Sequence, residues 1–123
     1  MGLINLEPTL HDGEQVLWRR PAALSLSDRM VAGLLYLTSE SLLFMPNRFN
    51  RRRYIVSTRI PVGLISGVDT LDPVRSLAAK RNGGMRRRLR VRAGQEALLF
   101  VINHPEQVAG ELVTALRESP EPA

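Results

Sequence analysis

Short apolar segments recur along this chain, and residues that favour turns separate each segment from the next. The segments are rich in Val, Leu, Ile, Phe and Tyr, and several alternate apolar with polar side chains, as a strand with one buried face does. The pattern predicts seven strands, over residues 15–25, 29–38, 41–45, 54–60, 64–71, 86–92 and 97–102.

The last apolar segment has a helical period instead. Its apolar positions form one stripe, Val108, Leu112, Val113 and Leu116. Pro105 suits the first position of a helix, and Glu106 suits the positive end of the helix dipole. We therefore predict a helix that begins near Pro105 and ends before Ser119-Pro120. A shorter helical piece is predicted over Val74–Arg81, followed by a turn at Asn82-Gly83-Gly84.

The stretch from Gly33 to Phe44 is the clearest hairpin. Two apolar runs flank Ser39-Glu40, a polar pair that favours a tight turn. Gly33 interrupts the first run, which indicates a bulge or the close approach of another backbone segment. Pro21 interrupts the preceding strand and must lie at an edge or a bulge, because proline has no N–H to donate to a neighbouring strand.

This hairpin also resembles the signature of the GRAM domain, a branch of the pleckstrin-homology-like folds. The matching positions are Gly33, Leu35, Tyr36, Thr38, Leu42 and Phe44. Gly13-Glu14 with the apolar pair after Gln15 is similar to the opening of the family. Ile60-Pro61-Val62 with Ile65 and Val68 is similar to a later segment, and Leu89–Val91 with Leu99–Val101 is similar to its last hairpin.

The resemblance implies a mainly β fold, a pleckstrin-homology-like (GRAM-type) bent sandwich or barrel of seven strands capped by one C-terminal helix. We expect residues 12–118 to form this domain, with residues 1–11 as a lead-in and 119–123 as a tail. In the family such domains serve membrane targeting or protein docking, some with a preference for phosphoinositides. The resemblance therefore implies a binding module and not an enzyme.

Charge is segregated along the chain. Residues 48–92 hold 13 basic and two acidic residues, whereas the remainder holds 4 basic and 10 acidic residues, and the whole chain carries a net charge of +5. Such segregation favours a basic surface that faces an anionic partner. The chain has no cysteine, no apolar run long enough to span a membrane and no basic leader, so we expect a cytoplasmic protein, with peripheral membrane association as an option.

Two groups of arginines are the candidate binding residues. The first is Arg48, Arg51, Arg52 and Arg53, with Phe49 and Tyr54 beside it. The second lies in the sixth predicted strand, where a period of two places Arg86, Arg88, Arg90 and Arg92 on one face and Leu89 and Val91 in the core. Both groups suit an anionic lipid surface, while the plainer alternative is a solvated loop and a row neutralised by Glu96 and neighbouring acids.

Catalysis has little support in the sequence. The two histidines, His11 and His104, each lie beside a turn or a helix start, and the serines lack the context of an activated nucleophile. Asn82-Gly83-Gly84 lacks the lysine and hydroxyl residue of a phosphate-binding loop. We expect no catalytic residue, no metal and no cofactor.

The sequence thus predicts a binding module that docks an anionic surface, most plausibly a membrane, through its arginines. An acidic protein partner or homo-oligomerisation through an exposed strand edge is the second reading. Nucleic acid ranks third, because exposed aromatic residues for stacking are scarce. The junction of the first two strands offers one arginine, Arg29, and one aspartate, Asp28, which favours a diffuse electrostatic mode over recognition of a specific headgroup.

Overall fold

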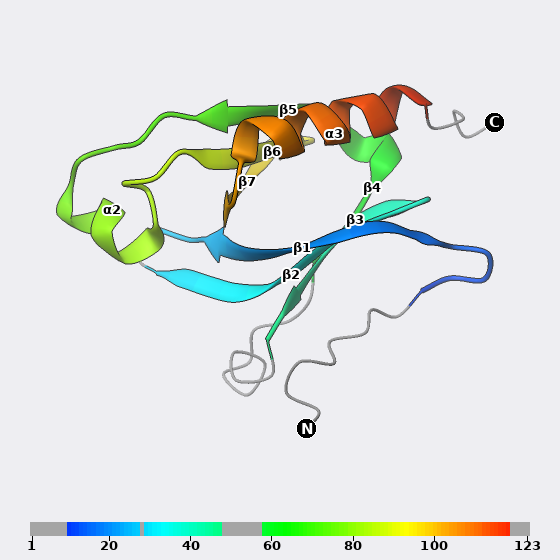
Figure 1. Cartoon of the computed structure of the whole chain (residues 1–123), viewed down its shortest axis with the longest axis horizontal. Helices are drawn as coiled ribbons and strands as arrows, with labels where there is room; N and C mark the ends of the chain where they lie inside the picture. Colours follow the sequence, from blue (N-terminus) through cyan, green and yellow to red (C-terminus); the bar gives the residue numbers. More distant parts are fainter. Residues whose placement is uncertain (1–9, 28, 48–57, 119–123) are drawn as a thin grey trace.

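The structure is a computed structural model that describes residues 10–27, 29–47 and 58–118 (Figure 1). These residues form seven strands, two α-helices and a short 3-10 helix. The strands are β1 (Val16–Ser25), β2 (Met30–Thr38), β3 (Ser41–Pro46), β4 (Thr58–Pro61), β5 (Ile65–Leu71), β6 (Arg88–Ala93) and β7 (Glu96–Ile102). The helices are η1 (Val62–Leu64), α2 (Leu77–Asn82) and α3 (Pro105–Glu118).

All neighbouring strands pair antiparallel, in the order β4-β3-β2-β1-β7-β6-β5. β1 joins the two halves of the sheet. It pairs with β2 from Val16 to Ser25, but with β7 only from Ala22 to Ser25. The sheet bends at β1 into two layers that face each other, and α3 packs along β5 and β6 (Figure 1).

The predicted fold class is confirmed: the chain is mainly β, with seven strands and a C-terminal helix. Among the described residues, two elements begin more than one residue away from their predicted start. The sixth strand begins at Arg88 and not at Arg86, and the short helix covers Leu77–Asn82 and not Val74–Arg81. Of the predicted fourth strand, residues 54–57 lie outside the described residues.

The core lies between the two layers. Its most deeply buried side chains come from β2, β3, β6, β7 and α3: Val31, Leu35, Leu37, Leu42, Phe44, Leu89, Val91, Phe100 and Leu112. The rings of Phe44 and Phe100 are 5.7 Å apart between centroids, so they join the two layers directly. Tyr36, Leu43 and Met45 form a second, smaller cluster on the other face of the β2–β3 hairpin. Alternation along these strands therefore buries both faces of the hairpin.

Gly33 and Pro21 show how the chain meets two local constraints. A Cβ atom on Gly33 would lie 2.1 Å from the carbonyl oxygen of Met45, so the predicted close approach of backbone is confirmed. Pro21 lies in a strand with neighbours on both sides, but at Pro21 itself the predicted edge is confirmed. It pairs with Leu34 of β2, and pairing with β7 begins one residue later, at Ala22. In the described sheet, β1 therefore has only one partner at Pro21.

Candidate functional site

Of the two predicted arginine groups, the structure describes only the second. Arg48, Arg51, Arg52 and Arg53 lie outside the described residues, as do Phe49 and Tyr54. Arg86, Arg88, Arg90 and Arg92 are described, but they do not share one environment. Arg86 precedes β6 and is exposed, Arg88 is buried, and Arg90 and Arg92 lie on the strand beside an acidic residue.

Asp69 is the acidic residue that forms ion pairs with Arg90 and Arg92. It stands opposite Arg90 in the β5–β6 register. Arg90 donates from Nε and Nη2 to the two carboxylate oxygens of Asp69 over 2.7 and 2.6 Å, and Arg92 Nη2 lies 3.8 Å from the same carboxylate. The hydrogen bond from Arg90 lowers the pKa of Asp69, although burial opposes the shift. The expected neutralisation of the row thus comes from Asp69, since Glu96 lies at the far end of the hairpin opposite Ala93.

Arg87 is paired as well. Its Nη1 lies 2.7 Å from Asp72 Oδ1, and its Nε lies 2.8 Å from Glu106 Oε1 in the first turn of α3. These exposed ion pairs hold the start of β6 between the end of β5 and the start of α3. An arginine bound to two acids of its own chain has less charge to offer a partner.

Arg88 differs most from the prediction. Only 6% of its surface is exposed, because the α2–β6 loop covers its side chain. Nη1 donates to Ser25 Oγ over 3.0 Å, whereas Nε is sealed from solvent with no hydrogen-bond partner. No carboxylate among the described residues forms a salt bridge with Arg88. Arg88 is therefore not part of an exposed arginine row.

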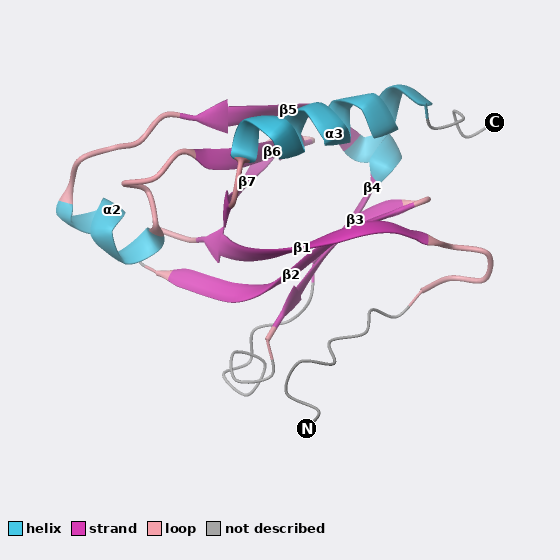
Figure 2. Ribbon diagram, in the orientation of Figure 1, coloured by secondary structure: helices cyan, strands magenta, loops and turns pink. Residues whose placement is uncertain are grey.

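Exposed basic residues without a salt bridge gather instead around α2. Within the described ranges, those at this end of the molecule are Arg29, Arg75, Lys80, Arg81 and Arg86. Elsewhere, Arg19 on β1 and Arg117 on α3 are the exposed basic residues that also lack a salt bridge in the described structure. Figure 2 shows α2 and its two long loops at one end of the sheet, next to the β1–β2 turn.

Large apolar side chains are exposed at the same end. Half of the exposed large apolar residues of the described structure lie there: Met30, Val74, Leu77 and Met85. Leu77 is the most exposed of them, at 79%, although it is the first residue of a helix. We give the name α2 end to the surface formed by Ser27, Arg29, Met30, residues 74–77, Lys80, Arg81, Met85 and Arg86. It combines unpaired positive charge with apolar side chains in contact with water.

Local chemistry fixes α2 in place. Ser76 is the N-cap and accepts a hydrogen bond from Ala79 N over 3.0 Å, and Gly83 ends the helix with a φ of 80°. The C-terminal residue Asn82 is tied to the β1–β2 hairpin. Its carbonyl accepts from Ser25 Oγ over 2.6 Å, and its side-chain amide donates to the Ser27 carbonyl over 3.4 Å. These bonds bring the cations of α2 to the β1–β2 turn, where the sequence offered only Arg29.

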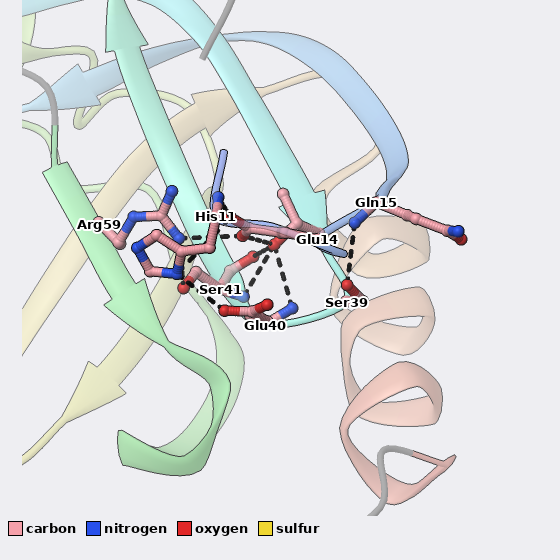
Figure 3. A network of polar contacts seen from close by, with 8 residues as sticks. His11, Glu14, Gln15, Ser39, Glu40, Ser41 and Arg59 are labelled. Atoms are coloured by element: carbon pink, nitrogen blue, oxygen red, sulfur yellow. Dashed lines mark hydrogen bonds and ion pairs between the residues drawn. The ribbon is translucent and has the colours of Figure 1, made fainter. Parts of the chain in front are cut away.

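A second polar network lies where the chain enters β1, around the carboxylate of Glu14 (Figure 3). The Glu14 side chain is 0% exposed. Its Oε2 accepts from Arg59 Nη1 over 2.9 Å and from the Thr38 hydroxyl, and its Oε1 accepts from His11 N over 2.9 Å. Burial by itself would raise the pKa of Glu14, but the bonds from Arg59, Thr38 and the His11 backbone outweigh it and lower the pKa to about 2.

Three residues of this network are of types that bind metals. One ligand atom each from His11, Glu14 and Glu40 lies within 4.8 Å of the others, and His11 Nδ1 is 2.8 Å from Glu40 Oε1. The guanidinium of Arg59 already neutralises Glu14 from 2.9 Å, and its positive charge opposes a bound cation. The geometry is that of a structural network, which fastens the turn before β1 to the β2–β3 turn.

A groove of about 510 Å³ runs between the first half of β1 and α3. Its lining includes Leu17 and Trp18 of β1 and Gly110 of α3. Trp18 Nε1 is buried without a hydrogen-bond partner in the described structure, and the Arg20 guanidinium stacks over the Trp18 ring at 5.1 Å. β1 pairs with β7 only beyond this region, so the strand edge faces the groove.

Sequence reasoning missed two of these features. It did not single out Met30, Val74, Leu77 or Met85 as exposed. The signal was present for Leu77, since Ser76 is a good N-cap and the first residue of a short helix is seldom enclosed. It also had no means to see Glu40 beside His11, because 29 residues separate them.

Solved structures with a similar fold include the following two. One is the C-terminal domain of an unknown protein from Leishmania infantum, with a TM-score of 0.65 and 14% identity over 87% of this chain and 88% of that chain. The other is the Vps36 N-terminal PH domain, with a TM-score of 0.64 and 14% identity over 91% of this chain and 86% of that chain. No protein-family model and no curated protein matches the chain. These likenesses establish a pleckstrin-homology-like fold.

None of the helices in the described part of the chain is long and apolar enough to cross a bilayer.

Proposed function

We propose that this protein is a non-catalytic, GRAM-type binding module that docks onto an anionic membrane surface through the α2 end. One observation carries the proposal. Exposed cations without salt bridges and exposed apolar side chains occupy the same end of the described structure. Anionic lipid attracts the cations, and the interface between headgroups and acyl chains accepts the apolar side chains.

The expected strength of docking follows from the number of free cations. Each basic residue close to an anionic bilayer contributes about 1 kcal/mol, so the five cations of the α2 end contribute at most roughly 5 kcal/mol. Insertion of Leu77 and Met85 adds the transfer of apolar surface from water. Arg90 and Arg92 contribute less to docking in this proposal than the sequence predicted, since Asp69 already binds Arg90 and lies close to Arg92.

Nucleic acid fits this surface less well than a membrane does. Binding to single strands uses aromatic side chains for stacking beside basic residues. Of the aromatic residues that the structure describes, Tyr36, Phe44 and Phe100 are buried, and Trp18 lies in the groove between β1 and α3, whereas Phe49 and Tyr54 lie outside the described residues. At the α2 end the exposed apolar side chains are aliphatic.

The test is co-sedimentation with vesicles of phosphatidylcholine alone or mixed with phosphatidylserine, at low and at near-physiological salt. The R81E/R86E variant removes two cations from the α2 end, and R19E/R117E makes the same change of charge elsewhere. We expect wild type and R19E/R117E to bind the anionic vesicles, more weakly at higher salt, and R81E/R86E to lose binding at near-physiological salt. Equal losses in both variants, or no binding by wild type, would refute docking through the α2 end.

A protein partner is the second candidate, and the groove between β1 and α3 favours it. Leu17 is exposed there, Trp18 Nε1 has no partner among the described residues, and no described strand pairs with this edge of β1. A dimeric mass in solution that W18A or L17D abolishes, in a protein that binds no lipid, would favour this function.

A further inference from the structure

Two methionines are the exposed sulfur-containing side chains of the described structure. The chain has no cysteine and four methionines, of which the structure describes Met30, Met45 and Met85. Met30 and Met85 are 43% and 47% exposed, whereas Met45 is 9% exposed and belongs to the buried cluster with Tyr36 and Leu43. A thioether in contact with water can be oxidised to a sulfoxide. Within the described ranges, this chemistry is therefore open to Met30 and Met85 and closed to Met45.

Both exposed methionines belong to the α2 end, although they are far apart in the chain. Met30 is the first residue of β2, and a Cβ atom on Gly83 would lie 2.6 Å from its Sδ atom. The sulfur therefore lies directly against the backbone of the residue that ends α2. Met85 follows Gly83 by two residues, in the turn between α2 and β6. The fold thus brings two thioethers to the C-terminal end of α2.

Oxidation of these sulfurs changes the α2 end in two ways. A sulfoxide is polar, so it favours water over the boundary between headgroups and acyl chains, which accepts apolar side chains. At Met30 it also adds an oxygen atom to a sulfur that lies against Gly83, and a close contact cannot take an extra atom unless a neighbour moves. The cations of the α2 end keep their charge. Oxidation therefore removes apolar insertion and leaves the attraction to anionic lipid.

We propose that Met30 and Met85 are modification sites at which hydrogen peroxide oxidises the thioether, and that this oxidation weakens the binding of the protein to membranes. A lone pair of Sδ attacks one oxygen of the peroxide, the O–O bond breaks and an S–O bond forms. Sulfur is oxidised to the sulfoxide, and the proton of the transferred oxygen passes to the leaving oxygen, which departs as water. The effect on binding rests on the membrane docking proposed above, whereas the oxidation itself does not.

The first arm of the test locates the oxidation. The purified protein is treated with dilute hydrogen peroxide, and mass spectrometry of its peptides follows the sulfoxide at each methionine with time. We expect Met30 and Met85 to be oxidised at least about tenfold faster than Met45, because Met45 is enclosed. Equal rates at the three residues would overturn the assignment of Met30 and Met85 as selective sites.

The second arm measures co-sedimentation with vesicles that contain phosphatidylserine, before and after treatment with peroxide. We expect oxidised wild type to bind at least about fivefold more weakly, and methionine sulfoxide reductases to restore the binding. M30L/M85L is the matched control, because leucine has a similar volume and no sulfur, while Met1, Met45 and Trp18 are still present. This variant should bind as wild type does and should keep its binding after peroxide.

The outcomes separate this inference from the docking function. An equal loss of binding in oxidised M30L/M85L would assign the effect to other residues and overturn the inference. Unchanged binding by oxidised wild type would overturn the effect of oxidation and leave docking intact. If wild type binds no vesicle before peroxide is added, docking and its control by oxidation are both refuted, and the first arm still decides where the protein is oxidised. If M30L/M85L does not fold, M85L replaces it and should lose less binding on oxidation than wild type does.

Discussion

At the scale of single residues, Glu14 has a buried carboxylate whose two oxygens both accept hydrogen bonds. Arg59, Thr38 and the backbone of His11 all donate to it. Charged groups of this kind stabilise a protein only while every partner is present, because a buried group that loses its partner keeps the cost of desolvation. The network therefore makes stability at this end of the molecule depend on pH.

Glu14 has a folded-state pKa of about 2, below its ordinary value of 4.5, so the unfolded chain takes up the proton more readily. Its contribution is complete above about pH 4.5 and is lost as the pH falls through the folded-state pKa. We expect E14Q to lower the free energy of unfolding at pH 7 by about 2 kcal/mol. Urea unfolding at several pH values should show the gap between wild type and E14Q narrow from pH 5 towards pH 2, and a constant gap would contradict this account.

Gly33 is needed because its position has no room for a side chain. Any side chain there would meet the Met45 carbonyl oxygen at 2.1 Å, inside the β2–β3 hairpin. We expect G33A to lower the free energy of unfolding by about 3 kcal/mol or more, because backbone on both sides must move. Gly67, where a Cβ would have nothing within 4 Å, is the control, and G67A should change stability far less. Similar losses in thermal unfolding for both variants would show that the contact is not the cause.

At the scale of elements, α3 is an amphipathic helix that closes the core against β5 and β6. Leu112 is its most buried residue, at 1% exposed, and Val108 lies one turn earlier on the same face. We expect L112A to lower the free energy of unfolding by about 3 kcal/mol, the usual cost of removing a buried leucine side chain. T114A, on the exposed side of α3, is the matched control and should change stability by less than about 0.5 kcal/mol in denaturant unfolding.

The strands show how far periodicity reaches. Alternation placed Leu89 and Val91 in the core, and both are fully buried. The same alternation placed Arg88 on the opposite face of the strand with Arg90 and Arg92. Alternation predicts on which face a side chain lies, but it does not predict whether that face is exposed. Whether the opposite face meets water depends on which element covers it, and here the α2–β6 loop covers only its first residue.

At the scale of the whole molecule, charge segregation along the chain does not become one basic face among the residues that the structure describes. Two acids from outside the basic segment form ion pairs with its arginines, Glu14 with Arg59 and Glu106 with Arg87. Asp69 forms an ion pair with Arg90 on the neighbouring strand. Of the seven exposed basic residues without a salt bridge in the described structure, five lie at the α2 end. The proposed docking surface is therefore set by which cations lack an acid and not by where cations are most frequent in the sequence.

The sequence by itself determined the class of fold, because alternation along strands, a helical stripe after Pro105 and turn residues between them are local signals. It also placed Gly33, Thr38, Leu42 and Phe44 in a hairpin that the structure confirms. Tertiary structure alone decided the candidate site, since pairing register, loop cover and burial join residues far apart in the chain. Asp69 meets Arg90 across two strands, Ser25 meets Arg88 over 63 residues, and α2 carries its cations to the β1–β2 turn through Asn82. No local sequence pattern predicts these long-range contacts, and the contacts determine which basic residues stay without an acidic partner.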